Sequence, residues 1–344
     1  MTRVGVVGAG AAAAALTYVV DGASAATVTV LEKSGGVCGR AATRRHGAST
    51  YDYGANYLQS DDERVNRLVE EVLGTDGLVD VTDPVYTFDC EGTVSPGRDA
   101  DEHKWSYVEG LTQVGERLFD ATDASVHHHT RAETVERADG TWTVVDTDGE
   151  RWGPFDVLVL NPPAPQTADL LRTAAWDDDR RETLVDAVAD VDYRSVWTAV
   201  LRYDFELDRP YYALVNTDKE HDVGWVAREE CKPGHVPDGE SLLVVQSNHE
   251  WATERFDEAP ERNVATLAAA TADVVGDARL TEPVWTDHQG WRYALPEAGV
   301  PGGPLQRAQE AGLYCVGDWV AGEGRLHAAL RCGLDVGERL TYAL

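Results

Sequence analysis

Val4-Gly-Val-Val-Gly-Ala-Gly-Ala-Ala-Ala13 is the stretch that decides the fold class of this chain. The apolar run at its start predicts a buried parallel strand. Gly8 permits a tight turn, Gly10 permits close approach to a pyrophosphate, and Ala13 fills the third small position of a G-x-G-x-x-G/A motif. The stretch therefore predicts a strand, a turn and a helix whose N-terminus can bind phosphate.

A second apolar strand, residues 27–31, ends in Glu32. This acid follows the glycine turn by about 20 residues, where a carboxylate can bind the hydroxyl pair of a ribose. With the strand, turn and helix before it, Glu32 indicates a dinucleotide site, to which we assign Ala11 and Lys33 as further contacts. At this point NAD and FAD both remain open.

Two more pieces narrow the dinucleotide to a flavin: Gly35-Gly-Val-Cys-Gly-Arg40 and Leu313-Tyr-Cys-Val-Gly-Asp-Trp319. Gly36 and Gly39 allow backbone N–H groups to face phosphate, and Arg40 can balance its charge. Asp318 can accept hydrogen bonds from a ribityl chain. The helix predicted from about residue 325 can stabilise an anionic reduced isoalloxazine.

In this order, the motifs resemble those of the flavin amine oxidase superfamily over nearly the whole chain. Within the superfamily the chain is most similar to renalases. The pieces that carry this similarity are residues 40–57, Val157-Leu-Val-Leu-Asn-Pro-Pro-Ala-Pro-Gln166, His288-Gln-Gly-Trp-Arg-Tyr-Ala-Leu-Pro296 and Gly317-Asp-Trp319.

The resemblance implies a non-covalently bound FAD. It also implies a small-molecule substrate, an isomeric dihydro form of a nicotinamide dinucleotide, whose hydride passes to the flavin; the reduced flavin then passes its electrons to oxygen. The cofactor contacts that we expect are Gly8, Gly10, Ala11, Ala13, Glu32, Lys33, Gly36, Gly39, Arg40, Asn56, Val126 (through its backbone, at the adenine), Asp318 and Ala328.

Two departures from the family pattern leave the substrate open. Cys38 stands where renalases commonly have glycine, and His327-Ala328 stands where their last helix usually opens with a Glu-Gly pair. The alternatives are a flavin amine oxidase, an isoprenoid or porphyrin desaturase, and, in another class, a non-catalytic flavin or NAD(P) sensor.

The candidate catalytic residues on the substrate side are His288, Trp291, Arg292 and Tyr293. In an extended segment Trp291 and Tyr293 share a face, where they could stack on a nicotinamide or line the flavin pocket. Arg292 could pair with a phosphate or with a surface acid. Hydride transfer needs orientation more than a strong acid or base, so the absence of a triad motif is no objection.

The predicted fold is α/β, with a Rossmann-like FAD-binding domain of the glutathione-reductase and amine-oxidase type. We assign residues 1–75, 106–165 and 300–344 to it. Turn-separated strands after residue 195 predict an antiparallel-sheet α+β substrate domain, residues 76–105 and 166–299. Locally, Asp139-Gly140 predicts a hairpin and Ser60-Asp-Asp-Glu63 predicts a helix capped by Ser60.

Charge sets the predicted environment of the protein. Sixty acidic against 30 basic residues give a net charge of −30, which makes nucleic acid an improbable partner. The sequence has no apolar run of 18 residues, so we expect no membrane span. Five cysteines without a C-x-x-C pair fit a reducing cytoplasm.

The consecutive His127, His128 and His129 cannot converge on one metal ion from a strand, so we predict no metal. The oligomeric state is left open.

The self-repulsion of this charge predicts a salt-dependent fold, from an organism with molar salt inside its cells. At molar salt the Debye length falls to about 3 Å, which screens the repulsion. Circular dichroism should show unfolding when KCl is dialysed away, and a spectrum unchanged at low salt would contradict the halophilic interpretation.

Overall fold

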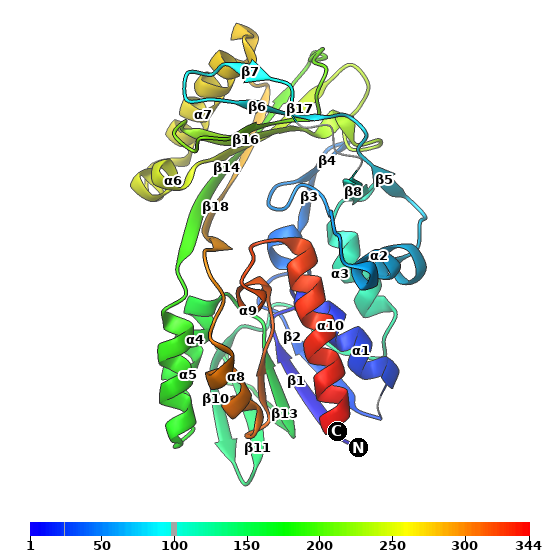
Figure 1. Cartoon of the computed structure of the whole chain (residues 1–344), viewed down its shortest axis with the longest axis vertical. Coiled ribbons are helices and arrows are strands. Elements are labelled where there is room, and N and C mark those ends of the chain that lie inside the picture. Colours follow the sequence, from blue (N-terminus) through cyan, green and yellow to red (C-terminus); the bar gives the residue numbers. More distant parts are fainter. Residues whose placement is uncertain (24, 98–101) are drawn as a thin grey trace.

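The computed structural model has two large β-sheets that lie at opposite ends of the molecule, as Figure 1 shows. It describes residues 1–23, 25–97 and 102–344; residues 98–101, which the predicted substrate domain includes, lie outside this description. Among the described residues, no helix combines the length and the apolar character needed to cross a membrane. The predicted α/β class, a parallel sheet joined to a mostly antiparallel one, is confirmed.

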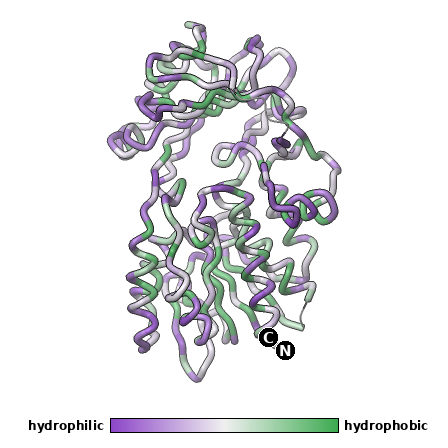
Figure 2. The backbone as a smooth tube through the Cα atoms, viewed as in Figure 1, coloured by the Kyte–Doolittle hydropathy of each residue, from purple (hydrophilic) through white to green (hydrophobic). Residues whose placement is uncertain are grey.

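The first sheet is parallel and has the Rossmann-like arrangement predicted from the opening glycines. Its strands, in spatial order, are β19 (Leu313–Cys315), β13 (Val157–Leu160), β1 (Arg3–Val7), β2 (Thr27–Leu31) and β9 (Ser125–His127). Figure 2 shows the hydrophobic character of these central strands. Both faces are covered, which is why β1 and β13 are apolar along most of their length.

Helices packed through small side chains cover one face of this sheet. They are α1 (Ala11–Ala23), α3 (Thr112–Asp120) and α10 (Leu326–Ala343). Ala11 to Ala15 are all buried, and a side chain at Gly333 of α10 would collide with the carbonyl of Ala12. The alanine run after the glycine turn therefore allows the first and last helices to lie in close contact.

The other face carries a three-stranded sheet and three helices that share a hydrophobic core with β13 and β19. These elements are β10 (Ala132–Ala138), β11 (Thr141–Asp146), β12 (Arg151–Phe155), α4 (Ala164–Arg172), α5 (Asp179–Ala189) and α8 (Gly302–Gln309). The hairpin predicted at Asp139-Gly140 is confirmed, with φ of 50° and 81° at its two turn residues. The predicted domain limits stay a prediction; α5 and most of α4, assigned there to the substrate domain, pack in this core.

The second large sheet is antiparallel except for one strand pair. Its order is β18 (Trp285–Pro296), β14 (Tyr193–Tyr203), β17 (Ser241–Ser247), β16 (Val223–Arg228), β15 (Ala213–Asn216), β6 (Val85–Phe88) and β7 (Val94–Ser95). Packed on it are α6 (His249–Arg255), α7 (Pro260–Val275) and η4 (Ala278–Thr281). The long strands β14 and β18 run from this sheet towards the parallel one (Figure 1).

Short elements connect the two large sheets. They are η1 (Gly39–Ala41), β3 (Thr43–His46), β4 (Ser49–Asp52), α2 (Glu63–Arg67), η2 (Leu68–Leu73), β5 (Leu78–Asp80), β8 (Trp105–Tyr107), η3 (Glu229–Cys231) and α9 (Asp318–Ala321). The prediction of Ser60 as a helix cap is wrong. Asp62 caps α2 by accepting from Arg64 N at 2.8 Å, and Ser60 Oγ instead accepts from Asp62 N.

A fully buried cluster of charged side chains joins β4 to the second sheet. Lys232 Nζ lies 2.9 Å from Asp52 Oδ2 and 2.9 Å from Glu229 Oε1. His235 Nδ1 lies 2.9 Å from Glu229 Oε2, and its Nε2 faces the carbonyl of Tyr107 at 2.8 Å. Burial alone would raise the pKa of Asp52, but Lys232 and His235 outweigh it and lower that pKa. Lys232 thus pairs with both buried carboxylates, and His235 links Glu229 to the backbone of Tyr107.

Lys232→Met should destabilise the protein by about 3–5 kcal/mol, because it leaves buried carboxylates without their counter-charge. Urea unfolding at fixed salt measures this. Arg172→Met is the matched control, since the Arg172–Asp169 pair is exposed and worth at most about 1 kcal/mol. Because the pKa of Asp52 is lowered in the fold, its contribution is lost as pH falls, so the variant should be less sensitive to acid than the wild type. Equal stability of the two variants would contradict this assignment.

Candidate functional site

A cavity of about 2820 Å³ lies between the two large sheets and is lined by residues from both. Its lower end is at the carboxyl edge of the parallel sheet, where ligands bind in open α/β folds. Its upper end is lined by Trp225, Gln246 and Trp291 of the second sheet. The middle of the cavity is lined by the segments 36–43, 53–57 and 317–318.

Glu32 stands at the lower end, at the edge of β2, as its position in the sequence predicts. Its carboxylate accepts from Ala9 N at 2.8 Å, from Ser34 N at 2.8 Å and from Ser34 Oγ at 2.5 Å. A carboxylate offers about four lone-pair positions, so capacity for a ribose hydroxyl remains. The two backbone contacts fix the carboxylate beside the glycine turn.

The glycine turn is closed by a residue from the next strand of the sheet. Gly10 N donates to Asn161 Oδ1 at 2.9 Å, and Asn161 Nδ2 donates to the carbonyl of Val316 at 3.1 Å. A side chain at Gly10 would collide with this amide oxygen. Asn161 therefore ties together the carboxyl ends of β1, β13 and β19, and Ala11 and Ala12 of the first turn of α1 line the cavity beside it.

The second glycine loop docks directly on this turn. Cys38 N donates to the carbonyl of Ala9 at 2.8 Å, and Cys38 and Gly39 both have left-handed backbone, with φ of 70° and 55°. The glycine that renalases commonly have at position 38 would suit this conformation. Burial raises the pKa of the Cys38 thiol to about 12, so it is an unreactive packing group opposite Gly115.

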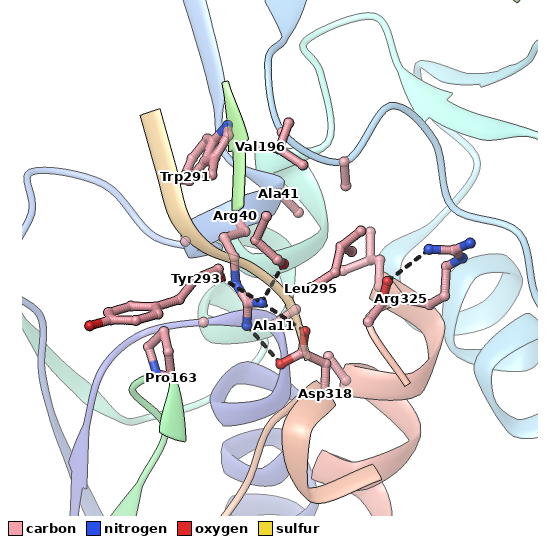
Figure 3. A pocket seen from close by; sticks show the side chains of 18 of the residues that line it. Ala11, Arg40, Ala41, Pro163, Val196, Trp291, Tyr293, Leu295, Asp318 and Arg325 are labelled. Carbon is pink, nitrogen blue, oxygen red and sulfur yellow. Dashed lines mark hydrogen bonds and ion pairs between the residues drawn. The ribbon is translucent and has the colours of Figure 1, made fainter. Parts of the chain in front are cut away.

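Arg40 joins this loop to two distant segments, as Figure 3 shows. Its guanidinium binds the Asp318 carboxylate with two hydrogen bonds of 2.8 and 2.7 Å, and donates to the carbonyl of Ala294 at 2.8 Å. Burial would lower the pKa of Arg40, but Asp318 raises it. Arg40 and Asp318, predicted as separate cofactor contacts, are thus a charge-balanced pair at the edge of the cavity.

The upper wall is built from stacked aromatic rings. Trp291 stacks on Tyr53 with ring centroids 5.3 Å apart and donates from Nε1 to the Tyr53 carbonyl at 3.2 Å. The guanidinium of Arg44 also lies over the Tyr53 ring, 4.1 Å from its centroid. Trp291, Arg292 and Tyr293 all line the cavity, although Arg292 forms an exposed pair with Asp257 at 3.3 Å.

Four predicted site residues do not reach the cavity: Ala13, Val126, Ala328 and His288. Ala13 and Ala328 are fully buried, as packing positions. Val126 pairs with Val30 on the edge strand β9, and Arg131 and Ala132 line the cavity instead. His288 stacks on Trp197, with ring centroids 5.3 Å apart, and borders a separate hollow. It lies three residues from Trp291 on β18, and side chains three apart on a strand point to opposite faces. The structure thus places His288 away from Trp291, and its catalytic role stays a prediction.

The other predicted contacts are brought together at this cavity: Gly8, Gly10, Ala11, Glu32, Lys33, Gly36, Gly39, Arg40, Asn56 and Asp318. Sequence reasoning missed Trp225, Gln246 and Arg325, which also line it. The strand containing Trp225 was predicted, but no local signal shows which of its faces meets the cavity. Cys315 and Cys332 are buried in the core, like Cys38.

Comparison with known families agrees with this geometry. Residues 6–72 match the NAD(P)-binding Rossmann-like domain family. Residues 98–341, more than half of the chain, match the flavin containing amine oxidoreductase family.

The chain belongs to the flavin amine oxidase superfamily. It is an FAD-dependent oxidoreductase, and the predicted FAD cofactor is confirmed.

Solved structures share the superfamily fold over the whole chain. A presumed protoporphyrinogen oxidase from Exiguobacterium sp. 255-15 is 16% identical with a TM-score of 0.81, and covers 100% of this chain and 99% of its own. A putrescine oxidase triple mutant is 14% identical with a TM-score of 0.76, over 100% and 99% of the two chains. Cyclohexylamine oxidase from Brevibacterium oxydans IH-35A is 13% identical with a TM-score of 0.75, over 99% of each. At these identities the likeness shows the fold alone.

The residues of this cavity fit FAD. The Glu32 carboxylate has remaining capacity for a ribose, the Gly8–Ala12 turn opens on the cavity at a helix N-terminus, and Gly39 has the left-handed backbone of a phosphate-binding loop. The cavity exceeds several-fold the roughly 300–1,000 Å³ of a pocket for one drug-sized ligand. It therefore has room for a cofactor and a substrate together.

Arg40→Met should raise the Kd for FAD about tenfold or more, because the bidentate pair that fixes Asp318 and the β18 backbone is lost. Titration of FAD into the apoprotein, followed by flavin fluorescence, measures the Kd. Arg3→Met, which breaks the exposed Arg3–Asp156 pair beside β1, is the control. Wild-type FAD affinity in a folded Arg40→Met protein would contradict a role for the pair in holding the cofactor.

Proposed function

We propose that this enzyme is a renalase-like oxidase that takes a hydride from an isomeric dihydronicotinamide dinucleotide. The observation that carries the proposal is the extension of one cavity from the Glu32 end to a wall of flat aromatic rings on the second sheet. A planar ring can stack on such a wall. The size of the cavity suits a substrate as large as a dinucleotide better than a small amine.

The residues of the chain would bind and orient the reactants. Trp291 and Tyr293 of β18 line the same cavity as Arg40 and Asp318, and would place a flat substrate ring against the flavin. Arg325 lines the same cavity, and among the described residues its guanidinium donates only to the carbonyl of Gly324, so its charge is available to a substrate phosphate. FAD, when bound, would accept the hydride and pass two electrons to oxygen.

Arg292 suits the phosphate role less well. Its guanidinium lies over Phe256 at 4.1 Å and beside the exposed carboxylate of Asp257. The sequence allowed Arg292 to pair either with a phosphate or with a surface acid. Its position in the structure favours the surface acid, Asp257.

Amine oxidation is the second candidate function. Its support is the full-length likeness to putrescine oxidase and cyclohexylamine oxidase, and the likeness to a presumed protoporphyrinogen oxidase gives similar support to a porphyrin desaturase. Membership of an oxidoreductase family speaks against the non-catalytic sensor.

We also propose that the enzyme works in a cytosol of high salt concentration. The net charge of −30 supports this setting, since molar salt would screen the repulsion between its acids.

Anaerobic stopped-flow mixing of the oxidised holoenzyme with isomerised NADH should bleach the flavin rapidly. Putrescine, cyclohexylamine and a porphyrinogen should bleach it far more slowly or not at all. Rapid bleaching by amines or by the porphyrinogen alone would replace the proposed function with the corresponding alternative. No bleaching by any member of this panel would overturn it.

A further inference from the structure

A β-bulge interrupts the pairing of β14 and β18 at the cavity. Strand pairing stops after Arg194 and resumes at Val196, so Ser195 of β14 lies opposite three residues of β18, 292–294. Ser195 and these three residues all line the cavity. A bulge leaves backbone groups without partners in the ladder and re-aims side chains, and bulges are frequent beside active sites.

Arg40 binds this bulge from the side of the cofactor loop. Its guanidinium donates to the carbonyls of Tyr293 and Ala294, at 3.3 and 2.8 Å, while it also binds Asp318 (Figure 3). Both carbonyls belong to residues that the strand register skips. The charged group that fixes Asp318 thus also satisfies two backbone acceptors of the bulge.

Ser195 and His249 bind the bulge from the other strand. Ser195 Oγ donates to the carbonyl of Arg292 at 3.0 Å. The backbone N–H of Ser195 donates to Nδ1 of His249, the first residue of α6, at 2.9 Å. The three successive carbonyls of residues 292–294 are therefore each bound by a side chain, and the backbone of the residue opposite them is held by His249.

The contact with Ser195 fixes the tautomer of His249. A backbone N–H can only donate, so Nδ1 is the acceptor and carries no proton. The neutral ring then carries its hydrogen on Nε2. Thr253 Oγ1 lies 3.4 Å from the same Nδ1 and donates to the backbone carbonyl of His249 at 2.8 Å. The contact therefore requires only an acceptor at the δ position of residue 249, which an asparagine oxygen can also supply.

The bulge carries Tyr293, whose ring is confined by a further contact. Tyr193 packs against it edge-to-face with ring centroids 5.6 Å apart, and the Tyr193 hydroxyl accepts from Ala164 N at 3.1 Å. Because Arg40 binds both the Tyr293 carbonyl and Asp318, the bulge is tied directly to the predicted flavin site. A small shift of the bulge would move the Tyr293 ring relative to the cofactor.

We infer that His249, acting through Ser195, is a positioning residue that holds Tyr293 in place beside the flavin. Arg40 ties the bulge to the cofactor loop, and His249 ties it to α6. The inference deepens the proposed function and rests on it for the identity of the substrate, because Tyr293 would orient a flat ring at the flavin. Misplacement of reacting groups by about 1 Å can cost about 100-fold in rate.

Stopped-flow reduction of the oxidised holoenzyme by isomerised NADH tests the inference. His249→Leu should lower the limiting rate of flavin reduction about tenfold or more and change the substrate Kd little, because orientation is lost rather than binding. His249→Asn should recover most of that rate, since its Oδ1 replaces Nδ1 as the acceptor. Failure of His249→Asn to do so would overturn the inference in favour of direct contact between the imidazole and the substrate.

His221→Leu is the matched control. Nδ1 of His221 also accepts from a backbone N–H, that of Val223, at 3.0 Å, but His221 is not among the described residues that line the cavity. The limiting rate of this variant should be that of the wild type. A loss as large as that of His249→Leu would contradict a specific role for His249.

The fluorescence decay of bound FAD gives a readout that needs no substrate. A tyrosine beside the isoalloxazine quenches flavin emission by electron transfer, whereas phenylalanine does not. Tyr293→Phe should therefore lengthen the decay, His249→Leu should lengthen it in part, and His249→Asn should restore the wild-type decay. An unchanged decay in Tyr293→Phe or in His249→Leu would overturn the inference.

The two readouts separate this inference from the proposed function. Decays that follow the prediction, in an enzyme whose flavin no dihydronicotinamide bleaches, would support the role of His249 and refute the proposed function. Bleaching by isomerised NADH, with neither rate nor decay altered in His249→Leu, would do the reverse.

Discussion

The ion pair between Arg40 and Asp318 is the contact on which the rest of the site depends. It joins residues 278 apart in sequence, and Arg40 also donates to the β18 backbone at Ala294. One guanidinium thus fixes the second glycine loop, the start of α9 and the strand that carries Trp291 and Tyr293. The Asp318 side chain is only 7% exposed, so losing its partner would leave a nearly buried carboxylate unpaired. Cofactor loop and substrate wall are therefore held in register by a single charged group.

The cavity wall that contains Trp291 is also held by a buried cluster of charged side chains. The buried cluster around Lys232 holds Asp52 at the end of β4, and the chain runs from there through Tyr53 and Gly54 into the cavity. A side chain at Gly54 would collide with the carbonyl of Arg40, so this segment lies directly against the cofactor loop. On its other side it meets Gln246 and Trp291 of the second sheet. The segment that forms the candidate substrate site is thus fixed at one end by buried charge and at the other by close backbone packing.

The parts of this fold that depend on neighbouring residues could be predicted from sequence. Gly8, Glu32 and the Asp139-Gly140 hairpin carry their conformation in local backbone chemistry. Contacts between distant segments could not be predicted in this way. Nothing near Gly10 indicates that Asn161 closes its turn, and nothing near Asp52 indicates Lys232 as its partner. The position of His288 could be predicted locally, because strand alternation from Trp291 places it on the opposite face. The faces of the second sheet depend on how it twists over the first, which no single strand encodes.

The central claim is that one cavity holds FAD along the parallel sheet and a flat substrate ring against the second sheet. A crystal structure of the holoenzyme with NAD⁺ tests it most directly. The account predicts FAD extending from Glu32 to the Arg40–Asp318 pair, with the nicotinamide ring against the aromatic wall that contains Tyr53 and Trp291. A nicotinamide ring bound outside this cavity, or an isoalloxazine remote from Arg40 and Asp318, would contradict it.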